Sequence, residues 1–411
     1  MPATFTREEA LVRFAAIAGD EHAQLAGDAV RVAPANTEQA AEVLRFANQH
    51  GLTVVPTGSG SKLGWGNPVA PEIFLSLARM NFVREHAWQD LTCTVQAGCT
   101  WAAMQAELAR HSQMVALDPL WPDLATVGGV VATNDSGALR LRYGGLRDLI
   151  IGMTLVLADG TIARTGGKVV KNVAGYDLHK LLTGSFGTLG VIAEVNFRLH
   201  PIEQHARTLT FAAPSAPSLA QPLRNLLHAQ MALSSAQLRI AEKQCALDVR
   251  IVTRPECLEQ HAAHLRSIFS PLADADASEA VWQSRQQLFS SPNAVIARVS
   301  LLPDDVCAAA AEWQQTCAAQ GVEVSLVAQA TGLMTIALSG PSGAIIGIID
   351  QFRTRLRPSG GSVVLLQIPD DLRGKIDVWD CRSDALPLMR EIKRRFDPHA
   401  ILNPGRFVGG I

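Results

Sequence analysis

Strand-like and helix-like patterns alternate at the start of the chain. Residues 30–33 form a short, mostly apolar strand candidate, and the apolar residues after it recur every three or four positions, as on one face of a helix. Asn36 or Thr37 is suited to cap that helix and Gly51 to end it. The apolar run at 52–55 predicts a second strand. A strand, a helix and a strand in this order favour parallel pairing.

Similar patterns continue along the chain and predict a mixed α and β protein. In the first half, Asp159-Gly160 separates two apolar runs, which predicts a β-hairpin. The second half alternates strand-like and helix-like segments and suits a split β-α-β arrangement. The expected strands are 73–77, 91–96, 149–158, 161–165, 191–199, 236–241, 247–252, 295–301, 322–328 and 333–338, and the expected helices are 101–110, 258–269, 305–319 and 342–356.

Glycine is unevenly distributed and divides the chain. Of the 32 glycines, 19 lie between Gly51 and Gly190, and none lies between residues 191 and 320. A glycine-dense half indicates many tight turns or a backbone that approaches a ligand closely. The Ala-Pro-Ser-Ala-Pro-Ser stretch at 213–218 is typical of a connector. We therefore expect a domain boundary near residue 205.

The composition excludes several classes of protein. Among 411 residues, 48% are apolar and 18% charged, and the formal net charge is −2. The chain can bury a large core, so it is not disordered overall. It has no basic tract, so the sequence predicts no nucleic-acid partner.

Cysteine usage and hydropathy bear on location. The seven cysteines show no CxxC spacing, so the sequence predicts neither a zinc ribbon nor an iron–sulphur cluster, and we expect free thiols in a reducing cytosol. The start of the chain lacks the pattern of a secretory signal. The uncharged run 324–349 is long enough to span a bilayer, but its Gly340-Pro341 turn predicts a strand, a turn and a helix instead. We expect no transmembrane segment.

The loop at 56–66 follows a predicted strand and is rich in glycine and serine. Small residues at 57–61 allow successive backbone N–H groups to converge on an anion such as a diphosphate. The loop is not a Rossmann fingerprint, because Leu63 stands where the third glycine would be, and it is not a P-loop. A plain glycine-rich turn is the alternative.

Three further segments leave the backbone similarly bare. They are 118–148, which contains Gly128-Gly129, then 170–192, and finally Leu402-Asn-Pro-Gly-Arg406. Each could be an ordinary turn. Four such segments in one chain favour a cofactor site.

Together these motifs resemble the FAD-binding domain shared by relatives of vanillyl-alcohol oxidase and p-cresol methylhydroxylase. The resemblance implies an α+β fold, in which a two-subdomain FAD-binding domain (1–204) carries a smaller α+β cap or substrate domain (205–375) and a C-terminal segment (376–411) returns to the FAD domain. The FAD-binding residues that it implies are Pro56, Thr57, Gly58, Ser59, Gly60, Ser61, Lys62, Gly64, Pro119, Thr126, Gly128, Gly129, Asn134, Ser136, Gly137, Gly184, Gly187, Gly190, Val191, Ile192 and Asn403.

More narrowly, the segment Lys171–Leu178 and the Gly-Ser-x-Ser-Lys form of the phosphate loop resemble the FAD-binding E subunits of bacterial glycolate oxidases. This resemblance implies oxidation of glycolate, a small 2-hydroxy acid, to glyoxylate. It also implies a complex with a homologous flavoprotein D subunit and an iron–sulphur F subunit. The location would be cytoplasmic, or peripheral on the inner membrane through those partners.

The chain departs from its relatives in two ways. Residues 57–66 contain no histidine or cysteine of the kind that attaches FAD covalently, so we expect non-covalent FAD. The C-terminal G-D-G-N-x-H motif of catalytic 2-hydroxy-acid dehydrogenases is also absent, and the region 360–366 has no histidine. A non-catalytic assembly or electron-relay subunit is therefore the alternative. An NADPH-dependent reductase that shares this FAD domain is a third possibility, but nothing marks the serine or glutamate that it needs as a proton donor.

Substrate binding requires cations that hold a carboxylate and a base that takes the hydroxyl proton. Arg250 and Arg298, each on an expected strand, are candidates for a carboxylate clamp, and exposure to solvent is the alternative. Lys62 and Lys171 are placed either to neutralise the diphosphate or to lie in solvent. No cluster of ligands predicts a metal.

Overall fold

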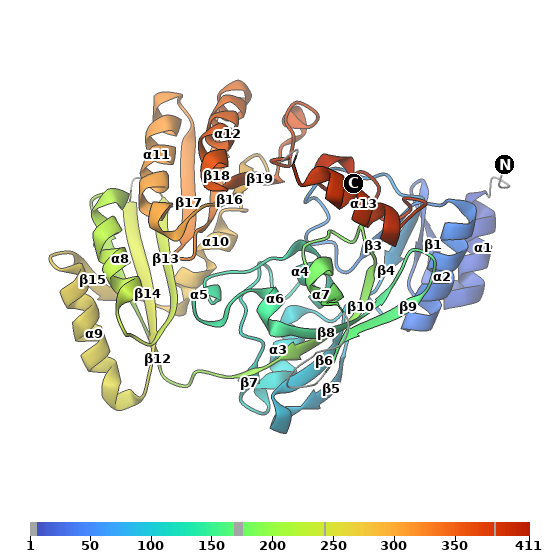
Figure 1. The fold of residues 1–411 in the computed structure, drawn as a ribbon, viewed down its shortest axis with the longest axis horizontal. Coiled ribbons are helices and arrows are strands. Elements are labelled where there is room, and N and C mark those ends of the chain that lie inside the picture. The colour runs from blue at the N-terminus through green and yellow to red at the C-terminus, as the bar shows by residue number, and fades with distance from the viewer. Residues whose placement is uncertain (1–5, 168–175, 242–243, 382–383) are drawn as a thin grey trace. The chain divides into compact units, whose positions relative to one another are not determined.

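The computed structural model describes residues 6–167, 176–241, 244–381 and 384–411 (Figure 1). The chain forms two compact units. The first comprises Met1–Ser136, Gly145–Ile202 and Cys381–Ile411, and the second comprises Gly137–Gly144 and Glu203–Asp380. These units differ from the expected ranges at residues 137–144, 203–204 and 376–380.

A four-stranded sheet begins the first unit, with the order β1-β2-β4-β3. Its strands are β1 (Ala23–Ala26), β2 (Ala29–Val32), β3 (Val54–Thr57) and β4 (Ile73–Ser76). The parallel direction predicted for β2 and β3 is confirmed, but β4 lies between them and pairs with both. Helices α1 (Arg7–Ala18) and α2 (Thr37–His50) pack together beside this sheet (Figure 1).

The ends of α2 follow the sequence closely. The side chain of Asn36 accepts a hydrogen bond from the backbone N–H of Gln39 at 2.8 Å, which caps the first turn. Gly51 ends the helix in the left-handed region at φ +68°. Between these caps, Val43, Leu44 and Ala47 are completely buried. The predicted helix is confirmed.

A five-stranded antiparallel sheet with the order β5-β6-β10-β8-β9 completes most of the first unit. The hairpin predicted around Asp159-Gly160 is formed by β8 and β9. The strands of this sheet are β5 (Val83–Ala87), β6 (Thr92–Gln96), β8 (Ile150–Val156), β9 (Ile162–Gly166) and β10 (Val191–Arg198). Outside the sheet, β7 (Gln113–Met114) pairs with β11 (His200–Pro201). The helices are α3 (Trp101–Ala109), α4 (Val127–Thr133), α6 (Leu146–Leu149) and α7 (Leu178–Leu182).

The C-terminal segment returns to the first sheet. Helix α13 (Leu386–Phe396) precedes it, and the backbone N–H of Val54 in β3 donates to the carbonyl of Ile401 at 2.7 Å. The N–H of Asn403 donates to the carbonyl of Val54 at 2.9 Å in return. These bonds fix residues 401–403 beside Val54 at the amino end of β3, the strand that leads into the loop at 56–66.

The second unit is built on an eight-stranded antiparallel sheet with the order β15-β12-β14-β13-β17-β18-β16-β19. All the strands and helices expected in this part of the sequence are present. The strands are β12 (Ala206–Ala213), β13 (Leu233–Ala241), β14 (Gln244–Val252), β15 (Ala273–Asp276), β16 (Val295–Ser300), β17 (Glu323–Gln329), β18 (Leu333–Ser339) and β19 (Ser362–Gln367); the helices are α5 (Arg140–Tyr143), α8 (Ala220–His228), α9 (Pro255–Phe269), α10 (Ser284–Gln287), α11 (Val306–Ala319) and α12 (Ser342–Leu356).

The two faces of this sheet differ in chemistry. One face is apolar and is covered by α8, α9, α11 and α12 (Figure 1). On that side Phe211 stacks on Phe269 and Trp313 stacks on Phe352, with ring centroids 4.4 and 3.7 Å apart. The other face carries polar side chains, among them the buried Asp248 and Gln237, which lie opposite each other on β14 and β13. A buried polar face suggests a role beyond packing.

Candidate functional site

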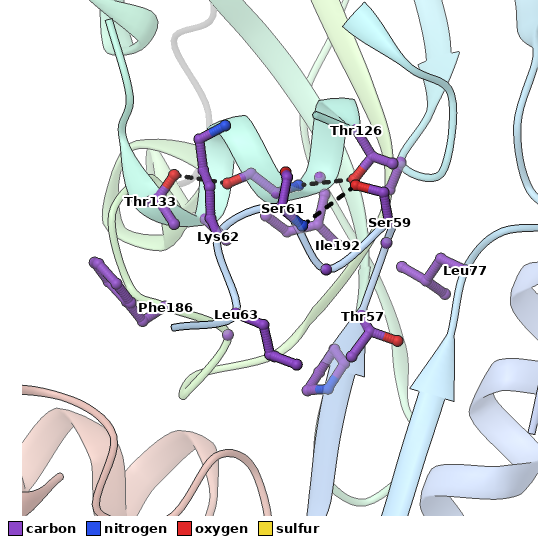
Figure 2. Close-up of a pocket in the computed structure, with 18 of the residues that line it drawn as sticks. Thr57, Ser59, Ser61, Lys62, Leu63, Leu77, Thr126, Thr133, Phe186 and Ile192 are labelled. Carbon is purple, nitrogen blue, oxygen red and sulfur yellow. Dashed lines mark hydrogen bonds between the residues drawn. The ribbon is translucent and has the colours of Figure 1, made fainter. Parts of the chain in front are cut away.

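A cleft in the first unit gathers the glycine-rich segments. Figure 2 shows its walls: the loop after β3, the start of α4 at Thr126, and Phe186 and Ile192 near β10. The C-terminal Asn403 and Arg406 complete the lining. Segments from four distant parts of the sequence therefore meet at one place.

The loop after β3 presents bare backbone to the cleft. The N–H groups of Gly58, Ser59 and Gly60 make no hydrogen bond with any described residue. Gly60 has φ +83°, a conformation that disfavours other residues, and a Cβ at Gly58 would lie 2.1 Å from Thr126 Oγ1. Thr57 adds a buried hydroxyl that has no hydrogen-bond partner among the described residues. Consecutive donors of this kind form a cradle for an anion.

Lys62 lies in the same loop, but its ammonium group points elsewhere. Its Nζ is 3.5 Å from Asp135 Oδ2 and 3.2 Å from the carbonyl oxygen of Leu120, and both charged side chains are buried. The ring of Trp121 lies 5.3 Å from the same nitrogen. Figure 2 shows the ammonium turned away from Thr57 and Leu63. The alternative of a solvated lysine is therefore wrong.

The C-terminal segment is tied to two walls of the cleft. Lys393 Nζ donates to the carbonyl oxygens of Thr188 and Leu402, each at 2.8 Å, and pairs with Asp397 at 2.6 Å. Asn403 Nδ2 donates to the carbonyl oxygen of Phe186 at 2.9 Å. These contacts hold the Asn-Pro-Gly turn against the loop that precedes β10.

Arg406 extends this connection to the anion cradle. Its guanidinium donates to Asn403 Oδ1 at 3.2 Å and to the carbonyl oxygen of Leu63. The residue is 7% exposed, and burial lowers the pKa of Arg406 to about 10, so the side chain is still cationic at neutral pH.

Most of the expected cofactor residues line this cleft. They are Pro56, Thr57, Gly58, Ser59, Gly60, Ser61, Lys62, Thr126, Gly128, Gly129, Gly187, Gly190, Ile192 and Asn403. Seven expected residues do not line it: Gly64, Pro119, Asn134, Ser136, Gly137, Gly184 and Val191. Lys171 lies outside the described residues.

Some of these seven residues have identifiable structural positions. Asn134 ends α4 in the left-handed region, and the N–H of Gly184 donates to the carbonyl of Val131 at 3.0 Å. A Cβ at Gly184 would lie 3.3 Å from that of Asn134. The two residues therefore hold α4 against the loop that precedes β10. Val191 is buried in β10, and Gly137 belongs to the second unit.

Sequence reasoning missed seven residues that line the cleft: Leu63, Leu77, Ala97, Ala132, Thr133, Phe186 and Arg406. Most are ordinary apolar residues without a signal of their own. Ala132 lies inside the Thr-x-Gly-Gly-x-x-Ala pattern that starts at Thr126, and Arg406 directly follows the Asn-Pro-Gly turn. Ala132 and Arg406 could have been predicted from these positions within or beside recognised motifs.

A polar cluster in the second unit surrounds Tyr143. The Tyr143 hydroxyl donates to Glu203 Oε1, and Arg142 Nε lies 3.8 Å from the same carboxylate. Burial, with the hydrogen bond to Glu203, raises the pKa of Tyr143, so the hydroxyl stays protonated at neutral pH. Arg250 is near enough to act on Tyr143 electrostatically and pairs with Glu279 at 3.1 Å.

The same sheet face carries a denser network around Asp248. This completely buried carboxylate accepts from Thr210 Oγ1 at 2.6 Å, from Gln237 Nε2 at 3.0 Å, and from Arg239 Nε and Nη2 at 2.5 and 2.8 Å. Two parallel bonds from one guanidinium form a strong charge-assisted pair.

The structure does not bring Arg250 and Arg298 together. Arg250 lies on β14 and Arg298 on β16, four strand steps apart in the sheet. At about 4.8 Å per step their backbones are separated by about 19 Å. Among the described residues there is no group of histidine, cysteine, aspartate and glutamate that could hold a metal ion.

Comparisons with known proteins agree with the geometry of the cleft. Residues 29–166 match a family described as FAD binding domain, and residues 381–407 match one described as FAD linked oxidases, C-terminal domain. The chain is 36% identical over 205 residues to glycolate oxidase subunit GlcD of Bacillus subtilis, covering 50% of this chain and 43% of that protein. It is 31% identical over 257 residues to D-lactate dehydrogenase of Archaeoglobus fulgidus, covering 62% and 57%. The chain thus spans about half the length of these curated relatives.

Solved structures share the whole fold. 4-Ethylphenol oxidase from Gulosibacter chungangensis and p-cresol methylhydroxylase each superpose with a TM-score of 0.75. Their sequences are 15% and 16% identical, and each match covers 97% of this chain and 96% of the other. The likeness establishes the fold alone.

Two conclusions follow from the geometry and the matches. The fold is α+β, of the vanillyl-alcohol oxidase and p-cresol methylhydroxylase type, as expected. The anion cradle lies within residues 29–166, which match an FAD-binding domain. Across the described part of the chain, no helix has the length and apolar character needed to cross a bilayer.

Proposed function

We propose that this protein is an FAD-dependent oxidoreductase subunit that oxidises a small 2-hydroxy acid, glycolate first among them, to the 2-keto acid. The observation that carries the proposal is the anion cradle at Gly58–Gly60 within a domain that matches FAD-binding domains. The substrates named for the two curated relatives, glycolate and D-lactate, are both 2-hydroxy acids. This shared chemistry supports the substrate class.

The residues present fit FAD. The free N–H groups of the loop and the Thr57 hydroxyl would hold the diphosphate, and Gly187, Gly190 and Ile192 would lie along the adenosine. When bound, FAD supplies an acceptor for the hydride of the substrate carbon. Non-covalent attachment is proposed because, among the described residues, none that lines the cleft is a histidine or a cysteine. Acid precipitation of the purified protein should release all of the yellow colour.

For the substrate carboxylate, the cluster around Tyr143 favours Arg250 over Arg298. Arg250 has a buried Nε without a hydrogen-bond partner among the described residues, and its Nη1 contacts the largely exposed Glu279. Tyr143 lies nearby as a hydroxyl that remains a donor. We propose that Arg250 holds the carboxylate by charge-assisted hydrogen bonds. Arg298 is then left without a proposed role in binding.

One observation favours the alternative of a non-catalytic assembly or electron-relay subunit. The eight strands of the second unit, as the structure describes them, contain no histidine. Because the pKa of Tyr143 is raised, its hydroxyl keeps its proton at neutral pH and is not available as the base that takes the substrate proton. Under this alternative FAD would bind in the same cleft, while the proton-abstracting group would belong to another chain.

We further propose that the protein works in a complex. The likeness to a subunit of glycolate oxidase supports a homologous flavoprotein D subunit as a partner. Electrons would leave through an iron–sulphur F subunit, because this chain has no cysteine spacing for a cluster of its own. The assembly would lie in the cytoplasm or peripherally on the inner membrane through the partners.

The test is a visible spectrum of the purified protein, recorded before and after anaerobic addition of glycolate, D-lactate or NADPH. A flavin band that bleaches with a 2-hydroxy acid supports the oxidoreductase proposal. A band that persists with every 2-hydroxy acid refutes catalysis by the isolated chain, and bleaching with NADPH alone would indicate a reductase instead. Absence of any flavin after incubation with FAD would refute the whole proposal.

A matched pair of variants tests Arg250. Arg250→Gln should abolish bleaching or raise the glycolate concentration needed for it at least tenfold, because the carboxylate loses its cation. Arg224→Gln removes the same charge at a half-exposed position on α8 and should leave bleaching unchanged. Equal behaviour of the two variants would exclude Arg250 from substrate binding.

A further inference from the structure

Two cations, Lys62 and Arg406, line the cleft in which the flavin nucleotide is proposed to bind. We infer that Arg406 supplies the positive charge that meets the diphosphate, whereas Lys62 stabilises the loop through Asp135. This inference rests on the proposed binding of FAD. It assigns an anion-recognising residue outside the glycine-rich loop, in the last six residues of the chain.

The contacts of Lys62 explain why its charge stabilises the loop instead of binding the ligand. Asp135 lies 3.5 Å away, and both side chains are at most 4% exposed. The carboxylate of Asp135 also accepts from the N–H of Leu120 at 2.7 Å, and Lys62 donates to the carbonyl of that same residue. A buried lysine paired in this way is costly to separate from its partner. An incoming diphosphate would have to compete with Asp135 for the charge.

Arg406 is placed differently with respect to the cradle. Its guanidinium donates to the carbonyl oxygen of Leu63, three residues beyond Gly60. It also contacts Asn403 Oδ1, so these two partners are neutral oxygens. The guanidinium is planar and carries five N–H donors, a geometry that suits the oxygens of a phosphate. The residue is buried in the wall of the cleft, where water screens its charge little.

The inference predicts which part of the ligand Arg406 recognises. ADP carries the diphosphate and the adenosine of FAD, whereas adenosine carries no phosphate. The charge of Arg406 should therefore strengthen binding of ADP and of FAD but not of adenosine. The ratio of the adenosine Kd to the ADP Kd isolates that charge from general changes in the cleft, because a partly misfolded variant loses both ligands together.

The experiment measures this ratio by calorimetry on flavin-free protein, alongside FAD affinity from flavin fluorescence. Arg406→Gln should lower the ratio about 10- to 100-fold, as expected for loss of one charge-assisted contact, and should weaken FAD to a similar extent. Arg406→Lys keeps the charge and should lose about tenfold or less. Arg164→Gln removes an exposed arginine from β9 in the same unit and should behave as wild type. Lys62→Met combined with Asp135→Asn neutralises the buried pair and should lower the ratio less than Arg406→Gln does.

Several outcomes would overturn the inference. An unchanged ratio in Arg406→Gln would exclude contact with the diphosphate. Weakened FAD with unchanged ADP would move Arg406 to the flavin ring end of the ligand. A larger loss in the Lys62 and Asp135 double variant would assign the diphosphate to Lys62. If wild-type protein binds neither FAD nor ADP, the proposed function fails instead, which separates the two failures.

Discussion

Replacing Gly58 by alanine should disturb the anion cradle through a single steric contact. A Cβ at this position would lie 2.1 Å from Thr126 Oγ1, 2.8 Å from its Cγ2 and 2.9 Å from its Cβ. Gly58 does not have a positive φ, so alanine is acceptable to its backbone. The effect of Gly58→Ala therefore comes from the collision with Thr126.

The cost can be worked from what must move. Rotating Thr126 would break the cap that its Oγ1 provides to the N–H of Gly129 at 3.4 Å; such caps contribute roughly 0.5–2 kcal/mol. Shifting the loop instead costs about 1–3 kcal/mol, as other overpacked sites do. Since either movement relieves the collision, we expect a cost of about 1–3 kcal/mol, divided between the free energy of unfolding and the free energy of FAD binding. Each 1.4 kcal/mol in binding weakens FAD about tenfold.

The assay combines urea unfolding of flavin-free protein with FAD titration by fluorescence. Thr126→Gly removes all three colliding atoms while costing only a few tenths of a kcal/mol at a capping position. The double variant Gly58→Ala with Thr126→Gly should therefore recover most of both losses. Gly64→Ala is the matched control, because a Cβ at Gly64 meets nothing within 4 Å; this variant should bind FAD as wild type does.

The reasoning would be refuted by a double variant that is as impaired as Gly58→Ala, since the steric contact would then not be the cause. Wild-type affinity in Gly58→Ala would equally refute it, because it would mean that the loop and Thr126 are not packed together when FAD binds. A loss of similar size in Gly64→Ala would indicate that any added methyl group disturbs the loop.

Three further predictions follow from the same cleft and its supports. Gly60→Glu should weaken FAD at least tenfold more than Gly60→Gln, because both share the strain of φ +83° and only glutamate places a charge in the cradle; equal titrations would contradict this. Lys393→Met should lower the free energy of unfolding in urea by about 3 kcal/mol, since it leaves buried Asp397 without its cation, and Asp397→Asn in addition should recover part of the loss. Burial lowers the pKa of His179, so the unfolded chain takes up this proton more readily. Wild-type stability should fall as pH drops below about 6.5, and His179→Gln should flatten that slope in urea titrations at pH 7.5 and 5.5.

The sequence predicted the elements of the fold well where the pattern was local. Helix α2 shows why: Asn36, the buried residues of one face and Gly51 each act within one turn of their neighbours. The order of strands was less accessible. The sequence could predict that β2 and β3 run parallel, but not that β4 lies between them. The position of β4 depends on contacts with strands that are distant in the sequence.

The cofactor cleft was predictable for a different reason. Its walls are made largely of backbone, and backbone can approach a ligand only where side chains are small, so the sequence carries the signal as glycine and serine. Charges carry no such signal. Lys62 lies inside the predicted loop, but it pairs with Asp135, which is 73 positions away in the sequence. No local sequence pattern indicates that partner.

Arg250 and Arg298 illustrate the same limit in the second unit. Both stand at comparable positions in expected strands, so the sequence treats them alike. The sheet order places them four strand steps apart and gives Arg250 the neighbourhood of Tyr143 and Glu279. Two residues on different strands can share a ligand only if the strands lie close together in the sheet. The sequence of one strand does not reveal its place in the strand order.

The short segment Gly137–Gly144 lies in the FAD-binding part of the sequence but belongs to the second unit. Gly137 ends the Thr-x-Gly-Gly motif that begins at Thr126, and the family resemblance implied that it binds FAD for that reason. In the structure the segment leaves the first unit after Ser136, packs α5 against β13 of the second unit, and returns at Gly145. The residues of this segment bring Tyr143 to Glu203. A fragment that stopped at residue 204 would keep the whole FAD cleft except its C-terminal wall, yet would leave α5 without the sheet on which it packs. The second unit is consequently built from a short segment inside the FAD-binding sequence and from residues 203–380, and it cannot be removed as one continuous piece without losing that contact.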